Sequence, residues 1–218
     1  LRCNAPKGVL SPALRDELAR RKPEILERLR LAEGLPQTVA APQQRYAPFP
    51  ITDIQAAYLV GRDEAFELGR IATHGYVEID FWDVDLARLN RAWQRVIDRH
   101  EMLRAVVNAD GTQQVLETVP PYEFAVTDLR GQPEAAIQAA LDALRAEMSH
   151  QVFATEQWPL FDLRAAYVAG NRFRLFLSID ILIADILSLM ILITEWSRFY
   201  DEPALHLPPL ELTFRDYM

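Results

Sequence analysis

The chain has 218 residues, 50% of them hydrophobic and 25% charged, and a formal net charge of −8, which disfavours general nucleic-acid binding. This composition suits one ordinary globular domain with a small appendage, and the single cysteine, Cys3, excludes an internal disulfide framework and fits a reducing compartment. The longest apolar stretch, residues 181–193, is too short for a membrane span, so we expect a cytoplasmic protein that makes no membrane contact.

The first 30 residues are basic, whereas the rest of the chain is acidic. They hold eight Lys/Arg against four Asp/Glu, a charge of +4, and the remaining 188 hold 15 against 27, a charge of −12. Residues 1–6 (LRCNAP) resemble a strand. Ser11 and Pro12 predict a helix start, and Pro23 predicts a second short helix. A unit this small needs a partner surface or further residues, and we expect the chain to be a piece of a longer protein.

Residues 35–48 (LPQTVAAPQQRYAP) predict a linker, because the segment is rich in Pro, Gln and Ala and its apolar residues do not recur at a helical or strand spacing. The body begins at Phe49. A short helix is expected to end near Gly61, and a strand at 75–81 alternates Val77, Ile79 and Phe81 on one face. Asp83 is expected to cap another helix, whose apolar stripe includes Leu89, Trp93 and Val96. The buried helix at about 184–200 is apolar nearly all round and is expected to lie in the middle of the protein. A further helix is predicted at 137–148. Further strands are predicted at 103–107, 114–117, 122–128, 162–168 and 172–179.

Two carboxylates lie inside the otherwise apolar segment SIDILIADILSLMILI, residues 178–193. Asp180 follows a strand, Asp185 falls in the first turn of the next helix, and Ser188 lies on the same helical face. A buried carboxylate is costly unless it is paired or hydrogen-bonded. Asp185 could therefore be a buried cap or an ion-pair partner, or this strand-to-helix loop could be a chemical site.

Metal and phosphate chemistry find no support in the sequence. The four histidines lack metal-ligand spacing, and no glycine-rich phosphate loop occurs. Two other segments stand out, FPITDIQAAYLVGR at 49–62 and RHEMLR at 99–104. On their own they could be a helix and a helix-to-strand turn with surface or ion-pair roles. Their polar residues of interest are Gln55, Tyr58, Arg62, Arg99, His100 and Arg104.

Taken in order, these segments resemble the motifs of heterocyclization domains of non-ribosomal peptide synthetases, over about residues 49–218. FPITDIQAAYLVGR resembles their opening motif, and RHEMLR resembles a motif shared with ordinary condensation domains. DILIADILS resembles the D-x4-D-x2-S signature that replaces the condensation motif H-H-x3-D-G. LPPLELTFRDY at 207–217 resembles the segment before the crossover to a second lobe.

The resemblance assigns roles residue by residue. Asp180 and Ile181 stand at the His-His positions, and Ile181 cannot transfer a proton. Asp185 matches the Asp that is chiefly structural and pairs with an arginine, so we predict that Asp185 is buried and paired with Arg62 or Arg104. Asp180 and Ser188 would shape or polarise a tunnel mouth, and direct acid–base work by Asp180 remains a hypothesis.

The fold implied is an α/β (α+β) sandwich, a lobe similar to chloramphenicol acetyltransferase. Two such lobes would enclose a tunnel, of which residues 49–218 form the N-terminal lobe. The implied reaction joins an upstream acyl thioester to carrier-bound Cys, Ser or Thr and cyclodehydrates the product to a thiazoline or oxazoline. Substrates ride on the phosphopantetheine of upstream and downstream carrier proteins, with no cofactor bound directly. Dehydration residues are expected in the second lobe, so this chain alone should be inactive.

Residues 1–34 resemble the latter part of the tubulysin-type docking domain, followed by the linker at 35–48. The resemblance implies that this piece binds the C-terminal tail of an upstream subunit, and a charge of +4 would suit an acidic tail. The same helices could instead merely brace the body. Partners would then also include the chain's own C-terminal lobe and an adenylation domain.

Three alternatives stay open. The domain could form the amide without cyclising it, or the chain could be a non-catalytic docking and scaffold module. An unrelated acyltransferase of the same superfamily would need an active-site histidine, and none stands at the expected place. The acyl donor and the choice among Cys, Ser and Thr are not determined by the sequence.

Overall fold

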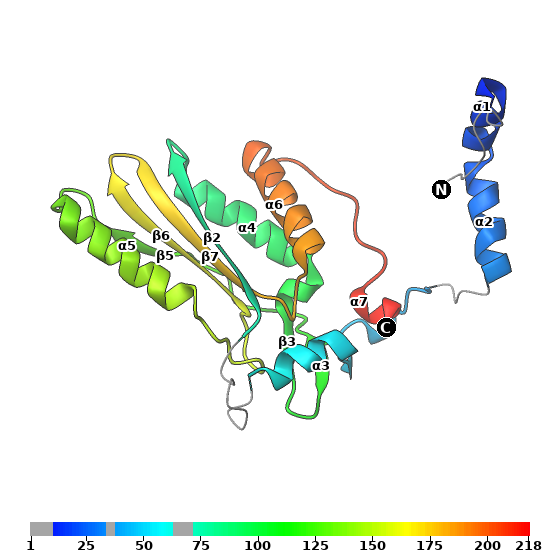
Figure 1. The fold of residues 1–218 in the computed structure, drawn as a ribbon, viewed down its shortest axis with the longest axis horizontal. Helices are drawn as coiled ribbons and strands as arrows, with labels where there is room; N and C mark the ends of the chain where they lie inside the picture. The colour runs from blue at the N-terminus through cyan, green and yellow to red at the C-terminus, as the bar shows by residue number, and fades with distance from the viewer. Residues whose placement is uncertain (1–10, 34–37, 63–71) are drawn as a thin grey trace. The chain divides into compact units, whose positions relative to one another are not determined.

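The computed structural model describes residues 11–33, 38–62 and 72–218 (Figure 1). The chain divides into two compact units, Leu1–Val39 and Ala40–Met218. The strand expected at residues 1–6 lies outside the described residues. In the part of the chain that the structure describes, no helix is long and apolar enough to cross a membrane.

The first unit contains the two expected helices, α1 (Pro12–Arg20) and α2 (Lys22–Glu33). Ser11 caps α1, because its Oγ accepts a hydrogen bond from the backbone N of Leu14 at 3.2 Å, and Pro12 occupies the first helical position. None of the side chains described in α1 and α2 is buried. These two helices therefore have little core of their own, as their size predicts.

The second unit is built on a four-stranded sheet in the order β2-β7-β6-β5. Its strands are β2 (His74–Trp82), β5 (Ala125–Asp128), β6 (Phe161–Ala169) and β7 (Arg172–Asp180). β7 pairs antiparallel with β2 and β6, and β5 pairs parallel with β6. The expected strands at 75–81, 162–168 and 172–179 are confirmed.

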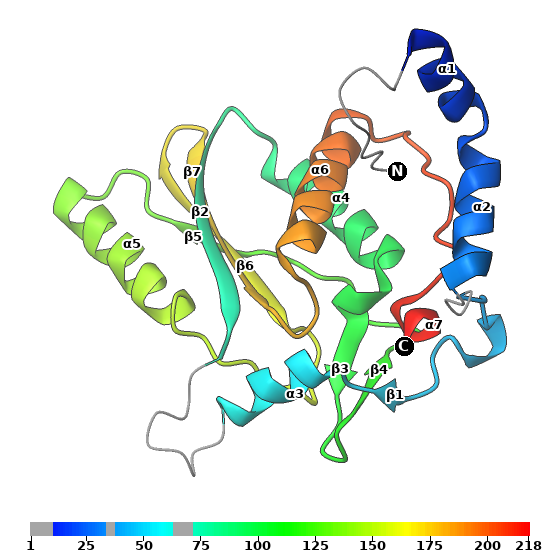
Figure 2. The same cartoon turned by 45° about the vertical axis from the view of Figure 1, so that its right-hand side comes forward.

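Helices cover both faces of this sheet, as Figures 1 and 2 show. Helices α4 (Leu86–Arg99) and α6 (Ile186–Asp201) lie on one face, and α5 (Glu134–Met148) lies on the other. Alternate residues of β7 serve the two layers, since Leu175 belongs to the α4/α6 core and Phe176 packs with α5. The predicted α/β sandwich is confirmed.

Aromatic side chains fill the core between the sheet and its two-helix layer. The ring centroid of Trp93 on α4 lies 4.9 Å from that of Trp196 on α6 and 5.6 Å from that of Phe161 on β6. Trp196 also donates a hydrogen bond from Nε1 to the carbonyl of Leu89 at 2.9 Å. These contacts attach α6 to α4.

A smaller sheet in the order β1-β4-β3 flanks the main one. Beside it lie the short helix α3, the return segment (residues 202–213) and helix α7, which ends the described chain (Figure 2). These elements form one end of the unit. Their bounds are η1 (Pro42–Gln44), β1 (Phe49–Pro50), α3 (Asp53–Val60), η2 (Glu101–Arg104), β3 (Ala105–Val107), β4 (Thr112–Val115) and α7 (Phe214–Tyr217).

Two local expectations are wrong. Helix α4 is capped by Asp85, whose Oδ1 accepts from the backbone N of Arg88 at 3.0 Å, whereas Asp83 has a left-handed φ of 53° outside the helix. The strand expected at 103–107 begins only at Ala105, because residues 101–104 form the 3-10 turn η2. Its buried Arg104 is discussed below.

Helix α6 is not buried all round. Leu192, Trp196 and Phe199 are buried, and one apolar face is left open. Only one stripe of the helix can reach α4 and the sheet, which is why burial stops there. The exposed apolar side chains are Ile186, Leu187, Met190, Ile191 and Ile193.

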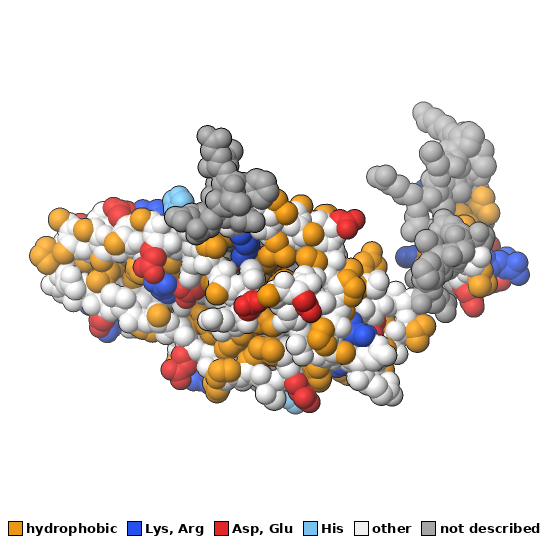
Figure 3. All heavy atoms as spheres, turned by 90° about the horizontal axis from the view of Figure 1, so that it is seen from below, with side chains coloured by type: hydrophobic (Ala, Val, Ile, Leu, Met, Phe, Trp, Pro, Cys, Tyr) orange, Lys and Arg blue, Asp and Glu red, His pale blue; other side chains and the backbone are white. Residues whose placement is uncertain are grey.

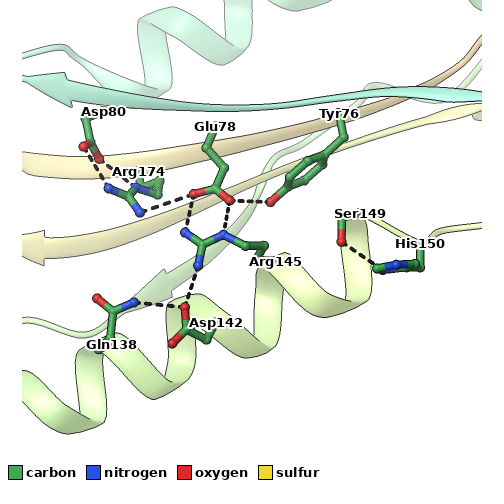
Figure 4. A network of polar contacts seen from close by, with 9 residues as sticks. All are labelled: Tyr76, Glu78, Asp80, Gln138, Asp142, Arg145, Ser149, His150 and Arg174. Carbon is green, nitrogen blue, oxygen red and sulfur yellow. Dashed lines mark hydrogen bonds and ion pairs between the residues drawn. The ribbon is translucent and has the colours of Figure 1, made fainter.

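The outer face of the sheet carries an ion-pair network that attaches α5 (Figure 4). Arg145 of α5 donates to Glu78 of β2 at 2.6 and 2.8 Å, and Arg174 of β7 donates to Asp80 at 2.8 and 2.9 Å. The Tyr76 hydroxyl donates to Glu78 at 2.8 Å. The network joins three elements without contributing to the pocket described next.

Candidate functional site

The loop between β7 and α6 carries the two aspartates of the motif. β7 ends at Asp180, and α6 begins at Ile186 with Asp185 as its N-cap. Backbone hydrogen bonds hold the first half of the loop, since Ile181 N donates to Thr73 O at 3.1 Å and Ile183 N donates to Asp180 O at 3.2 Å. The strand-to-helix placement expected from the sequence is confirmed.

Asp180 is the buried, paired aspartate. Its side chain is 0% exposed and forms an ion pair with Arg62, which follows α3. The second carboxylate oxygen accepts the backbone N of Leu182 at 3.0 Å. Arg62 also donates to the carbonyl of Phe153 at 3.4 Å. The pair therefore joins the end of β7, the end of α3 and the segment that contains Phe153.

The prediction that Asp185 is buried and paired with Arg62 or Arg104 is wrong. Asp185 is exposed, and its Oδ1 accepts the backbone N and the hydroxyl of Ser188, each at 2.7 Å. These hydrogen bonds, the backbone one foremost, hold the pKa of Asp185 below its usual range. The helix start satisfies this carboxylate without an arginine.

Arg104 is buried but binds backbone carbonyls. Its guanidinium donates to Ile97 O at 2.7 Å, to Asp98 O at 2.9 Å and to Leu116 O at 3.2 Å. Arg104 thus closes the C-terminal end of α4, where helix carbonyls lack intrahelical partners.

Arg99 and His100 converge on a residue that the sequence reasoning missed. Glu195 of α6 accepts from Arg99 Nε at 2.9 Å, and its Oε2 lies 2.7 Å from His100 Nε2. Glu195 stands seven residues after Ser188, two helical turns along the same face. The sequence signal that could have revealed Glu195 is a carboxylate on an otherwise apolar helix, on the same face as Ser188 of the motif.

Gln55 links α3 to the motif loop. It forms a capping box with Thr52 and is buried, donating from Nε2 to Leu182 O at 2.8 Å and to Gln113 Oε1 at 2.9 Å. The buried amides of Gln55 and Gln113 thereby hold the loop backbone against the small sheet.

A pocket of about 620 Å³ lies where α3, η2, α6 and the return segment meet. Its walls are mainly apolar. The surface of the molecule seen from below, by contrast, mixes apolar and charged side chains (Figure 3). Of the predicted site residues, Gln55, Tyr58, His100, Asp185 and Ser188 line the pocket, whereas Asp180, Arg62, Arg99 and Arg104 do not.

The pocket brings polar groups to two places along an apolar cavity. Asp185 and Ser188 lie at the start of α6, and His100 and Glu195 lie two turns further on. Ile181 also lines the cavity and cannot exchange a proton. Within the described residues, no group of three or more His, Cys, Asp or Glu is placed to hold a metal ion. The arrangement suits holding and orienting an apolar group.

Comparison with known sequences decides the family. The sequence profile of the condensation domain matches residues 78–218. The chain belongs to the condensation-domain family. The profile of the TubC N-terminal docking domain matches residues 1–30, so the docking segment expected at the head of the chain is confirmed as well.

Curated relatives of this condensation-type chain are large synthetases. Pyochelin synthetase PchF of Pseudomonas aeruginosa is 40% identical over 221 residues, covering 100% of this chain and 12% of PchF. Phenyloxazoline synthase MbtB of Mycobacterium tuberculosis is 36% identical over 191 residues, covering 84% of this chain and 13% of MbtB. The chain therefore spans a small part of the relatives that it matches.

Solved structures agree. The EpoB cyclization-docking bidomain from Sorangium cellulosum has a TM-score of 0.86 and 41% identity, covering 98% of this chain and 42% of that chain. The non-ribosomal peptide synthetase FmoA3 has a TM-score of 0.69 and 37% identity, covering 84% of this chain and 18% of that one. The expected likeness to heterocyclization domains is confirmed.

Proposed function

We propose that residues 49–218 are the N-terminal lobe of a heterocyclization domain in a non-ribosomal peptide synthetase subunit. Residues 1–34 would be part of a docking domain, and residues 35–48 a linker. The observation that carries the proposal is the D-x4-D-x2-S loop beside an apolar pocket, in a chain 41% identical to a cyclization-docking bidomain. The relative MbtB is a phenyloxazoline synthase by name, which supports the same class of reaction.

The proposed reaction has two stages. The amine of carrier-bound Cys, Ser or Thr attacks an upstream acyl thioester, forming the amide and releasing the carrier thiol. The side-chain thiol or hydroxyl then adds to the amide carbonyl, and loss of water closes a thiazoline or oxazoline. The first stage needs mainly proximity and orientation, which the pocket can supply. The second needs a proton donor and acceptor near the carbonyl.

The motif residues then have different roles. Asp180 acts structurally, because both of its carboxylate oxygens are occupied, one by Arg62 and one by Leu182 N. Asp185 and Ser188 line the pocket and are the groups of the motif that could meet a substrate. Groups that carry out dehydration would be supplied by the second lobe.

We propose that the second lobe covers the exposed apolar face of α6. Ile186, Leu187 and Met190 are 70%, 65% and 62% exposed, although such side chains normally avoid water in contiguous patches. The EpoB chain is more than twice as long as the part matched here. The lobe alone would then lack half of its tunnel and be inactive.

The remaining partners follow from the same proposal. Upstream and downstream carrier proteins would deliver substrates on phosphopantetheine, and the docking piece would bind the tail of an upstream subunit in the cytoplasm. An adenylation domain of the same subunit would select the acceptor.

Intact-mass analysis tests the proposal. A cysteine-loaded downstream carrier is incubated with an acyl-loaded upstream carrier and with the full-length subunit that contains this chain. A product at the mass of the amide minus one water is expected. A product that stops at the amide would favour a condensation domain that does not cyclise, and no product would favour a docking module.

A further inference from the structure

We infer that Glu195 is a positioning residue that holds three walls of the pocket in register. The inference rests on the proposed function for its effect on the reaction, but its structural part is independent of it. Two pocket walls, α6 and the start of η2, meet at this carboxylate, and Arg99, which binds it, also donates to the return segment.

Glu195 is held by two groups from the end of α4. Arg99 Nε lies 2.9 Å and His100 Nε2 lies 2.7 Å from the same oxygen, Oε2. The three side chains are only 15–17% exposed. A carboxylate this far from water is stabilised by such partners, and a hydrogen bond to a charged group is strongly directional. The contact therefore fixes where α6 lies along α4.

Arg99 extends the contact to the return segment. Its Nη1 donates to the carbonyl of Pro208 at 2.6 Å. Arg45 supports the neighbouring part of the same segment, pairing with Glu101 of η2 and donating to Leu210 O at 3.4 Å. The return segment contributes Leu210 and Leu212 to the pocket. The wall formed by the return segment is thus held by hydrogen bonds from two arginine side chains to backbone carbonyls, and one of these arginines, Arg99, also binds Glu195.

Two polar contacts from neighbouring residues of α6 resist its rotation. Trp196 donates to the carbonyl of Leu89 within α4, and Glu195 binds Arg99 and His100 at the end of α4. Successive helical residues point about 100° apart, so the two contacts together resist rotation of the helix. Asp185 and Ser188 lie two to three turns toward the N-terminus and move with it.

The role of Glu195 is positioning and not catalytic. Its function is to keep Asp185 and Ser188 at a constant place in the pocket, and a displacement of about 1 Å in such groups can cost roughly 100-fold in rate. Apolar packing of α6 alone would tolerate sliding, because it is not directional.

The test uses Glu195→Gln in the full-length subunit, with Glu202→Gln as the matched control. Glu202 is an exposed acid at the C-cap of the same helix. Hydrogen exchange at residues 186–190 and 207–213, which exclude both substituted positions, is the structural readout. Exchange should be faster in Glu195→Gln than in the wild type and unchanged in Glu202→Gln. Unchanged exchange in Glu195→Gln overturns the inference, whatever the reaction shows.

The kinetic readout separates positioning from loss of fold. Glu195→Gln should lower kcat by roughly 10- to 100-fold while the KM for the loaded carriers stays within about twofold. His100→Gln removes one of the two partners of Glu195 and should lower kcat by a smaller factor. The double variant should be no worse than Glu195→Gln, because the contact between residues 100 and 195 is already weakened there. A wild-type kcat, or a loss that matches the fraction of unfolded protein, overturns the inference.

The two proposals fail in different ways. A wild-type subunit that forms no ring product would refute heterocyclization, whereas the hydrogen-exchange comparison would still decide the role of Glu195.

Discussion

The carboxylate of Asp180 is paired with the guanidinium of Arg62, although the two residues lie 118 positions apart in the chain. The pair is almost completely buried, with Arg62 9% and Asp180 0% exposed. It joins the last residue of β7 to the end of α3, so the motif loop between β7 and α6 starts from a fixed point. This burial and pairing support the structural role proposed for Asp180.

Removing either partner should strongly destabilise the fold. Arg62→Ala or Asp180→Leu leaves a buried charge or polar group without its partner, and we expect a loss of about 3–5 kcal/mol in the free energy of unfolding measured with urea. Replacing both partners, Arg62→Met with Asp180→Leu, should recover much of it. Arg91→Ala, an exposed arginine on α4, is the control and should change stability by less than about 0.5 kcal/mol. Single variants as stable as the control would contradict the structural role.

The cap at Asp185 should respond differently, because it is exposed. Asp185→Ala removes the acceptor for Ser188 N and should cost about 1 kcal/mol of stability, whereas Asp185→Asn keeps an acceptor and should cost a few tenths. Unfolding in urea measures both. If Asp185→Ala were as damaging as Asp180→Leu, the assignment of the buried role to Asp180 would be wrong.

The outer-face network should make stability depend on acid pH (Figure 4). Hydrogen bonds from Arg145 lower the pKa of Glu78 from 4.5, and those from Arg174 lower the pKa of Asp80 from 3.8. A depressed folded-state pKa stabilises the protein above the unfolded pKa, and that contribution disappears as the pH falls through the folded-state pKa. The wild type should therefore lose stability below about pH 4.5.

Glu78→Gln is the variant that isolates this effect. It should be less stable than the wild type at pH 7, and the difference should shrink as the pH falls below about 4.5. Urea unfolding across this range measures it. A difference that stays constant or grows on acidification would rule out Glu78 as its source.

The exposed apolar face of α6 gives a prediction that compares this chain alone with the full-length subunit. Met190→Glu should change the stability of this chain by less than about 0.5 kcal/mol, because the side chain is 62% exposed. Leu192→Ala, at a position 4% exposed, should cost about 2–5 kcal/mol. In the full-length subunit Met190→Glu should also become destabilising, since a charge would enter the interface between lobes. Thermal unfolding of the subunit measures this, and a neutral result there would argue against a covering lobe.

Local patterns in the sequence predicted most of the elements. Ser11-Pro12 marked the start of α1, and the alternation of Val77, Ile79 and Phe81 marked β2. The apolar spacing of Leu89, Trp93 and Val96 marked α4. These signals depend on neighbours within one or two turns, so a single chain segment carries them. The N-cap of α4 was misplaced by two residues because Asp83 and Asp85 are both good caps.

The sequence by itself determined the order of the elements, the sandwich, the docking segment and the place of the motif loop. Only the tertiary structure decided which aspartate is buried, which arginine pairs with it and which face of α6 is open. Those outcomes depend on residues brought together from distant segments, such as Arg62 with Asp180 and Glu195 with His100, separated by 118 and 95 positions. The sequence pattern of an apolar helix is the same whether one stripe or its whole surface is covered. The pattern depends only on the character of the side chains, whereas burial depends on the neighbouring elements that pack against them.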